Sequence, residues 1–218
     1  MNNVLIIGGT NKTADNIAFE LEKQGYTIEC MTYRDEEKII NQNRQWEYLD
    51  LFDEKSVEKF LESQKNKKYN KIILTIANSA SAPDLSLDFD KLDLKKFYGT
   101  FCVNYIFLIK GLLKNIADYG SMIYISSIAT QINYRDAIYS SGKALIQCYI
   151  LSLKDFLKEG QSICSISPGT ILNSTAYNRL PEGHHNRLNS HLLASPKGIS
   201  ELIINSGLYN GQNIKIGN

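Results

Sequence analysis

The chain of 218 residues is 43% hydrophobic and 22% charged, and its 24 Lys and Arg against 23 Asp and Glu leave a net charge of +1. This length suits one domain with a sizeable core, and the balanced charge argues against nucleic acid or an anionic membrane as the main partner. No apolar window is long enough to span a membrane and no signal-like segment opens the chain, so a cytoplasmic protein is expected. The four cysteines show no paired spacing and lie in apolar stretches, which predicts buried thiols rather than a zinc site or disulfides.

Apolar segments that are typical of buried strands alternate with segments of helical periodicity. The pattern predicts strands at 4–7, 27–33, about 48–49, 71–76, 121–125, 163–166 and 212–216. It predicts a first helix that ends near Gly25 and further helices at about 54–63, 93–118, 136–158 and 196–206, the last capped by Ser195. Polar loops are expected at 78–90 and 173–194. This alternation indicates an α/β, three-layer Rossmann fold: a doubly wound parallel sheet of about seven strands, formed by residues 1–218 as a single domain.

Two residues suited to proton transfer, Tyr139 and Lys143, lie four positions apart in the helix predicted at about 136–158. On one helix face, the ammonium can sit near the phenol and favour its ionised form. With 13 tyrosines in the chain, about one such pair is expected by chance, so the spacing alone proves nothing. Placement adds weight, because Ser126 and Ser127 close an apolar strand shortly before the pair and another strand follows it.

Further motifs fall in order around this pair. They are Gly8 in the first strand-to-helix turn, Asp50 after the third strand, Asn-Ser-Ala-Ser at 78–81, Asn104 on the long helix, Pro168-Gly169, and Tyr-Asn-Gly-Gln at 209–212. With these residues the chain resembles the short-chain dehydrogenase/reductase family along nearly its whole length, and in particular its ketoacyl reductases. The resemblance implies a catalytic set of Asn104, Ser127, Tyr139 and Lys143 and a nicotinamide cofactor.

The activity that this resemblance implies is reversible hydride transfer between the nicotinamide and a small carbonyl or secondary alcohol. Tyr139 would be the general acid/base, Lys143 would lower the tyrosine pKa and hold the nicotinamide ribose, and Ser127 would bind the substrate oxygen. Asn104 would keep a helix turn open for a water that links Lys143 to solvent. Ser126 stays an alternative to Ser127, because the serine-to-tyrosine spacing is one residue shorter than is common in the family.

The implied cofactor-binding residues follow the predicted strands. They are Gly8, Thr10, Asn11, Lys12, Thr13, Arg34, Asp50, Leu51, Asn78, Ser79, Ala80, Tyr139, Lys143, Pro168, Gly169 and Ile171. The first turn keeps only one family glycine, and Lys12 replaces the middle one, where it either pairs with a phosphate or crowds the cofactor. Arg34 at the end of the second strand favours NADP over NAD, whereas Asp35 and Glu36, which follow it, suit NAD.

The loop at about 173–194 would cover the substrate and does not reveal its identity. It holds His184, His185 and His191, which an exposed polar loop explains without a metal, so no metal site is expected. The resemblance also implies a homodimer or homotetramer formed by the two long helices. Their surplus apolar residues belong either to that interface or to the core: Phe101, Phe107, Leu108, Ile146, Tyr149 and Leu153. A competing hypothesis from another class is a non-catalytic nucleotide-binding or scaffolding relative whose cofactor turn has decayed.

Overall fold

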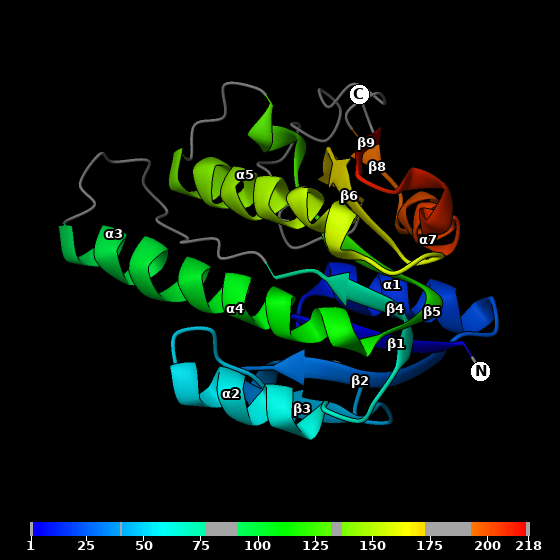
Figure 1. Cartoon of the computed structure of the whole chain (residues 1–218), viewed down its shortest axis with the longest axis horizontal. Coiled ribbons are helices and arrows are strands. Elements are labelled where there is room, and N and C mark those ends of the chain that lie inside the picture. Colours follow the sequence, from blue (N-terminus) through cyan, green and yellow to red (C-terminus); the bar gives the residue numbers. More distant parts are fainter. Residues whose placement is uncertain (1, 40, 77–90, 132–136, 173–192, 217–218) are drawn as a thin grey trace.

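The computed structural model describes residues 2–39, 41–76, 91–131, 137–172 and 193–216, and its centre is a seven-stranded parallel sheet in the order β3-β2-β1-β4-β5-β6-β9 (Figure 1). The chain runs from β1 outward to β3, returns to β4 on the other side of β1, and continues outward to β9. This is a doubly wound arrangement, and it confirms the predicted fold class. The strands are β1 (Asn3–Ile7), β2 (Thr27–Tyr33), β3 (Trp46–Tyr48), β4 (Tyr69–Leu74), β5 (Ile116–Ile125), β6 (Ser162–Pro168) and β9 (Gln212–Ile216).

Helices cover both faces of the sheet. One face packs against α1 (Lys12–Lys23) and α7 (Pro196–Ile204), and the other against α2 (Glu54–Ser63), α4 (Val103–Leu112) and α5 (Ala137–Ser152). Figure 1 shows α4 between α2 and α5. Because central strands are buried on both faces, they form continuous apolar runs in the sequence: in β1, Val4 and Ile6 enter one core while Leu5 and Ile7 enter the other.

Side-chain caps fix where three helices begin. Asn11 accepts a hydrogen bond from the amide of Ala14 at 2.8 Å, and Asp53 accepts one from Lys55 at 3.0 Å. Ser195 caps α7 with Pro196 in the first turn, as predicted. Each such cap contributes about 1 kcal/mol.

The long helix predicted at 93–118 is interrupted and ends earlier. A short helix, α3 (Lys91–Lys96), passes into a π-helical segment, η2 (Phe97–Cys102), and then into α4; a 3-10 turn, η3 (Leu113–Asn115), follows. The prediction was wrong for 116–118, because β5 already begins at Ile116. There Ile116 is buried and pairs with Tyr69, a long-range contact that helical periodicity does not reveal.

Other boundaries also differ from the prediction. The strand predicted at 71–76 ends as β4 at Leu74, and the one predicted at about 48–49 is β3, at Trp46–Tyr48. A small second sheet joins β7 (Thr170–Ile171) to β8 (Leu193–Ala194), so residues 193–194 are not loop as predicted. The helix predicted at 136–158 ends as α5 at Ser152 and is followed by a 3-10 turn, η5 (Leu153–Phe156). The substrate loop predicted at 173–194 otherwise lies outside the described residues, as does the loop predicted at 78–90.

Burial distinguishes core from surface among the apolar residues of the long helices and among the four cysteines. Most of the six apolar candidates for an interface belong to the core, where Phe101, Leu108, Ile146 and Leu153 are buried, whereas Phe107 is exposed and Tyr149 is half-buried. Three of the four free thiols are buried as predicted, but the prediction was wrong for Cys148, which is exposed on α5. In the part of the chain that the structure describes, no helix combines the length and apolarity needed to cross a membrane.

Candidate active site

The turn between β1 and α1 leaves no room for side chains at its two glycines. Gly8 has a φ of +88°, and a Cβ atom there would lie 2.6 Å from Cγ1 of Ile76; at Gly9 it would lie 2.8 Å from the ring of Trp46. The amides of Gly8 and Gly9 donate to the side-chain and backbone oxygens of Thr32, at 2.7 and 2.8 Å. The pyrophosphate of a dinucleotide would therefore meet the first amides of α1 rather than those of the glycines.

Asn11 ties this turn to β4. Besides capping α1, its Nδ2 donates to the carbonyl of Gly8 at 2.6 Å and to Oγ1 of Thr75 at 3.3 Å. Oγ1 of Thr75 lies 2.9 Å from the carbonyl oxygens of both Ile7 and Gly8. One amide side chain thus fixes the start of α1 against the carboxyl ends of two neighbouring strands.

Lys12 is the first residue of α1, and its side chain is exposed. It extends into solvent and does not fill the turn. Thr10 and Thr13 lie half-buried beside it. The helix N-terminus and this ammonium together favour an anion at the carboxyl edge of the sheet.

Two cationic side chains, those of Arg34 and Lys96, lie near the ring of Phe52, in the segment that follows β3. The guanidinium of Arg34 lies 5.8 Å and the ammonium of Lys96 5.3 Å from the ring centroid of Phe52. Asp35, the acid that would suit NAD, is instead ion-paired with Lys38 at 2.6 Å. The hydrogen bond from Lys38 lowers the pKa of the Asp35 carboxyl, and the charge of Arg34 adds a smaller contribution. None of the ion pairs among the described residues includes Arg34 or Lys96.

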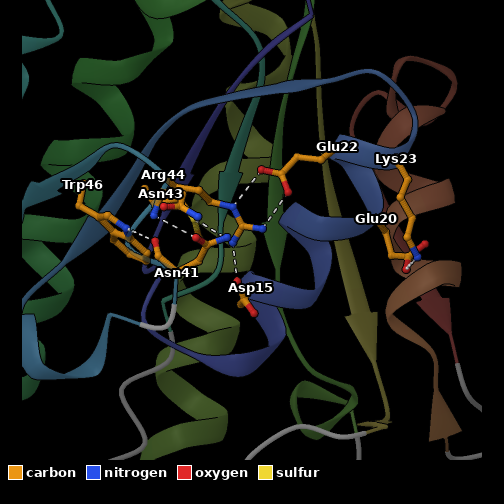
Figure 2. A network of polar contacts seen from close by, with 9 residues as sticks. Asp15, Glu20, Glu22, Lys23, Asn41, Asn43, Arg44 and Trp46 are labelled. Atoms are coloured by element: carbon orange, nitrogen blue, oxygen red, sulfur yellow. Dashed lines mark hydrogen bonds and ion pairs between the residues drawn. The ribbon is translucent and has the colours of Figure 1, made fainter.

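Arg44, the second arginine between β2 and β3, is engaged elsewhere. Figure 2 shows its guanidinium held by Asp15 and Glu22 of α1, and its side chain is only 5% exposed. Burial opposes its charge, but the hydrogen bonds to Glu22 and Asp15 outweigh that effect and raise its pKa. The indole of Trp46 donates to the carbonyl of Asn41 at 2.8 Å in the same network. These contacts bind the segment between β2 and β3 to α1.

Asp50, Leu51 and Asn104 form one connected group after β3. Oδ1 of Asp50 accepts a hydrogen bond from the amide of Phe52 at 3.0 Å, which shapes the turn. The carbonyl of buried Leu51 accepts one from Nδ2 of Asn104 at 2.9 Å. The buried side chain of Asn104 is therefore directed to the Asp50–Leu51 turn, and its link to Lys143 through water stays a prediction.

The two serines at the end of β5 differ in their partners. Ser127 is half-buried and caps a 3-10 turn, η4 (Ile128–Thr130), by accepting a hydrogen bond from the amide of Ala129 at 3.1 Å. Ser126 is 4% exposed, and its hydroxyl has no hydrogen-bond partner in the described structure. A buried hydroxyl without a partner is costly and often marks a functional group or an ordered water, so both serines remain candidates.

Tyr139 lies on the first turn of α5, half-buried, and Lys143 follows one turn later on the same face. The ammonium of Lys143 donates to the carbonyl of Ile125 at 2.7 Å and to that of Ile76 at 3.3 Å. Burial lowers the pKa of Lys143 to about 7. Ile76 also packs on Gly8, so a single residue joins the cofactor turn to the proposed proton-transfer pair.

The remaining candidates lie farther along the same edge or outside the described residues. Pro168 closes β6, the amide of Gly169 donates to the carbonyl of Ile216 at 2.9 Å, and Ile171 belongs to β7. Asn78, Ser79, Ala80 and the three histidines cannot be placed, because they lie outside the described residues. Within the described ranges no group of three or more His, Cys, Asp and Glu side chains is arranged to hold a metal ion.

Some residues of this site escaped the sequence reasoning. Thr32 and Thr75 hold the glycine turn, and Phe52 and Lys96 accompany Arg34. Tyr124, whose ring lies under Lys143, reads in the sequence as one more apolar strand residue. The usable signal was positional, because Thr32, Tyr124 and Thr75 lie in or next to strands at the edge where ligands bind.

Comparison with known proteins identifies relatives of this arrangement. The profile of the short chain dehydrogenase family matches residues 2–182. A short chain dehydrogenase family protein from Francisella tularensis subsp. tularensis SCHU S4 has a TM-score of 0.76 at 22% identity, with 99% of this chain and 97% of the other covered. BdcA in complex with NADPH has a TM-score of 0.78 at 16% identity, with 99% and 92% covered.

A third solved structure is that of a reductase. Enoyl-[acyl-carrier-protein] reductase (NADH) from Aquifex aeolicus VF5 has a TM-score of 0.77 at 15% identity, with 98% of this chain and 94% of the other covered. At these identities the likeness concerns the fold. No curated protein matches the chain in sequence.

Proposed function

The chain belongs to the short-chain dehydrogenase family, and on this premise we propose that it is an NAD(P)-dependent oxidoreductase acting on a small carbonyl or secondary alcohol. The observation that carries the proposal is the junction at Ile76, which contacts Gly8 of the cofactor turn and accepts a hydrogen bond from Lys143. Ile76 is therefore the single residue that separates the turn from α5, the helix that bears Tyr139. Two similar structures, one described with NADPH and one as an NADH-dependent reductase, support a nicotinamide cofactor.

The described residues fit an anionic dinucleotide. The N-terminus of the twelve-residue helix α1 and the exposed Lys12 suit the pyrophosphate, and Arg34 with Lys96 suits further negative charge beside the adenosine. Gly8 and Gly9 keep the turn compact, although their own amides are satisfied by Thr32. The replacement of the middle family glycine by Lys12 therefore leaves the turn open to a phosphate.

Each residue then has a defined part in the reaction. When bound, the nicotinamide supplies or accepts the hydride. Tyr139 donates the proton to the substrate oxygen in the reducing direction, and Lys143 favours the ionised phenol afterwards and binds the nicotinamide ribose. Ser127, with Ser126 as the alternative, holds the substrate oxygen by a hydrogen bond. Asn104 supports the Asp50–Leu51 turn, which would bind the adenine.

We further propose NADP as the preferred cofactor. Arg34 and Lys96 carry no carboxylate partner among the described ion pairs, whereas the acid favouring NAD, Asp35, is paired with Lys38. Because Arg44 is neutralised by Asp15 and Glu22, Arg34 is the guanidinium of this segment that can meet a 2′-phosphate. We also propose, from the family resemblance, the balanced charge and the sequence composition, a small-molecule carbonyl or alcohol as the partner, a cytoplasmic location, and no nucleic acid or membrane as partner.

Separate titrations with NADPH and NADH test the binding step. Trp46, the single tryptophan, packs against Gly9 and should report occupancy by fluorescence, with calorimetry as a check. We expect Arg34→Ala to weaken NADPH binding by roughly 10-fold or more and to leave NADH unchanged, since one charge-assisted contact is worth about 1.5–3 kcal/mol. Lys55→Ala, an exposed lysine on α2, is the control. If neither nucleotide binds at millimolar concentration, the proposal is wrong.

A panel of small carbonyl compounds tests the chemistry. Tyr139→Phe should lower kcat by about 10²-fold or more, because it removes the proton donor while leaving the ring in place. Cofactor affinity should change little in this variant. Unchanged turnover would remove Tyr139 from the mechanism, and tight NADPH binding without turnover on any carbonyl would favour the non-catalytic alternative.

A further inference from the structure

The ammonium of Lys143 is buried, and no carboxylate of the described part of the chain is paired with it. The residue is 5% exposed. Two of its three N–H donors meet the carbonyls of Ile125 and Ile76. An aromatic face also borders the ammonium, since Nζ lies 4.8 Å from the ring centroid of Tyr124. Such a contact is strongest where water is excluded.

The ring of Tyr124 is itself held in place by a row of aromatic side chains. From Tyr124 the row runs to Tyr105 of α4 (ring centroids 6.3 Å apart, 72° between planes), then to Phe101 (6.0 Å) and Phe97 (5.5 Å). Its far end presses on α5 again, because a Cβ atom at Gly142 would lie 2.6 Å from the ring of Phe97. The row therefore touches α5 at two adjacent residues, Gly142 and Lys143.

We propose that Tyr124 is a positioning residue for Lys143, whose ring face takes the place of a carboxylate and holds the ammonium charged at the carboxyl ends of β4 and β5. The inference rests on the proposed function only where it concerns catalysis. Packing against the aromatic row keeps the ring of Tyr124 from rotating away from Lys143. The alternation of side chains along β5 directs Tyr124 to the face of the sheet on which Lys143 lies. Tyr124 lies in β5 on the face covered by α4 and α5, together with Met122 two residues before.

Several titratable groups surround the ring of Tyr124 on which the Lys143 ammonium lies. Among the described residues they are Tyr139 from α5, Tyr105 from α4 and Cys102 from η2. Burial raises the pKa values of Tyr124, Tyr105 and Cys102, so these groups supply no negative charge at neutral pH. Burial lowers the pKa of Lys143 to about 7, so even a modest loss of support converts it to the neutral amine. The aromatic face and two carbonyl dipoles oppose that loss.

Two substitutions separate the ring face from the hydroxyl. Tyr124→Phe keeps the face and removes the hydroxyl, whereas Tyr124→Leu removes the face. The titration of Lys143 is followed by NMR of lysine labelled with ¹³C at Cε, with Lys143→Met to assign the resonance. We expect Tyr124→Leu to lower the pKa of Lys143 by about one unit and Tyr124→Phe to change it by less than about 0.3 unit. Phe60→Leu, which removes a buried ring of the same core on α2, controls for general loosening.

The proposal is overturned if Tyr124→Leu leaves the Lys143 midpoint at the wild-type value, or if Phe60→Leu or Tyr124→Phe moves it equally. Should Tyr124→Leu not fold, pentafluorophenylalanine at position 124 keeps the ring shape and reverses the charge of its face. The same downward shift is then expected. No shift with the fluorinated ring would equally overturn the inference.

Activity gives a second readout. In the pH profile of kcat/KM, the limb that reports the titration of Lys143 should shift to lower pH in Tyr124→Leu. In Tyr124→Phe it should stay at the wild-type position. Because the NMR titration needs neither substrate nor cofactor, it stands even if no carbonyl compound is reduced, in which case the proposed function fails and this inference does not. If the wild type is active and neither readout moves, the inference alone fails.

Discussion

A second buried lysine, Lys71 of β4, shows how this protein accommodates charge away from the candidate site. Its ammonium donates to Oγ of Ser206 at 2.8 Å, to the carbonyl of Ile204 at 3.2 Å and to Oγ of Ser121 at 3.4 Å. Ile204 ends α7, where helix carbonyls favour a cation. Lys71 thereby links the end of α7 to the middle of the sheet. Burial nevertheless lowers its pKa to about 8.

This lowered pKa makes stability depend on pH in a defined direction. Between about 8 and the model-peptide value of 10.5, the unfolded chain binds the proton at Lys71 more strongly than the folded protein does. The free energy of unfolding therefore gains from this residue as pH rises through that window. From about pH 7.5 to about pH 9.5, we expect the free energy of unfolding of the wild type to rise by about 2 kcal/mol relative to that of Lys71→Met, measured by urea unfolding.

Lys68→Met is the matched control, because Lys68 is exposed to solvent. A difference between Lys71→Met and wild type that does not vary with pH would contradict the assignment. Cys164 interacts electrostatically with Lys71, whereas groups without such an interaction are common to both proteins and cancel in the comparison.

At the scale of elements, the junction of β1, α1 and β4 depends on Asn11. Its acceptor oxygen caps the helix and its amide nitrogen holds the turn to Gly8 and Thr75. We expect Asn11→Ala to lower the free energy of unfolding by about 1–2 kcal/mol through the lost cap. The melting temperature should fall by roughly 2–8 °C in a chain of this size.

Asn11→Asp divides the two contributions, because a carboxylate keeps the acceptor but loses the donor to Gly8 and Thr75. Its loss of stability should be smaller than that of Asn11→Ala. Its loss of NADPH affinity should be larger, since a carboxylate at this turn repels phosphate. A loss of stability from Asn11→Asp as large as that from Asn11→Ala would contradict this division.

The elements also show how far sequence reasoning reaches. The continuous apolar runs of β1 and β4 and the cap at Ser195 were predictable, because burial on both faces and capping leave local signatures. The start of β5 at Ile116 was not, since it depends on pairing with Tyr69, far away in the chain. The same holds for the candidate site: the spacing of Tyr139 and Lys143 is local, whereas the approach of Tyr124 to Lys143 and of Asn104 to Leu51 arises only when strands and helices pack.

At the scale of the whole molecule, exposed apolar side chains on α4 and α5 support the proposal of a homodimer or homotetramer. Val103 is 54% and Phe107 45% exposed on α4, one turn apart, and Leu145 on α5 is 36% exposed. Burying these side chains against a second copy would remove apolar surface from water. The described residues thus offer a face for association that the core does not use.

The double variant Val103→Glu/Phe107→Glu tests this face, because burying two carboxylates in an interface is strongly unfavourable. We expect the wild type to be dimeric or tetrameric by light scattering after size exclusion, and the double variant to be monomeric. Phe156→Glu, at a 78% exposed aromatic residue outside this face, should leave the assembly unchanged. A monomeric wild type at micromolar concentration would refute the proposed assembly.

The central position of β1 has a consequence for how the chain finds its fold. Val4 pairs with Ile28 of β2 on one side and with Lys71 of β4 on the other, so the two neighbours of this strand differ greatly in sequence separation. Closing the longer loop costs more chain entropy, and contacts between distant residues slow folding. We therefore expect β1, α1 and β2 to assemble early as a local unit. The docking of β4 onto the still open side of β1 should then set the refolding rate.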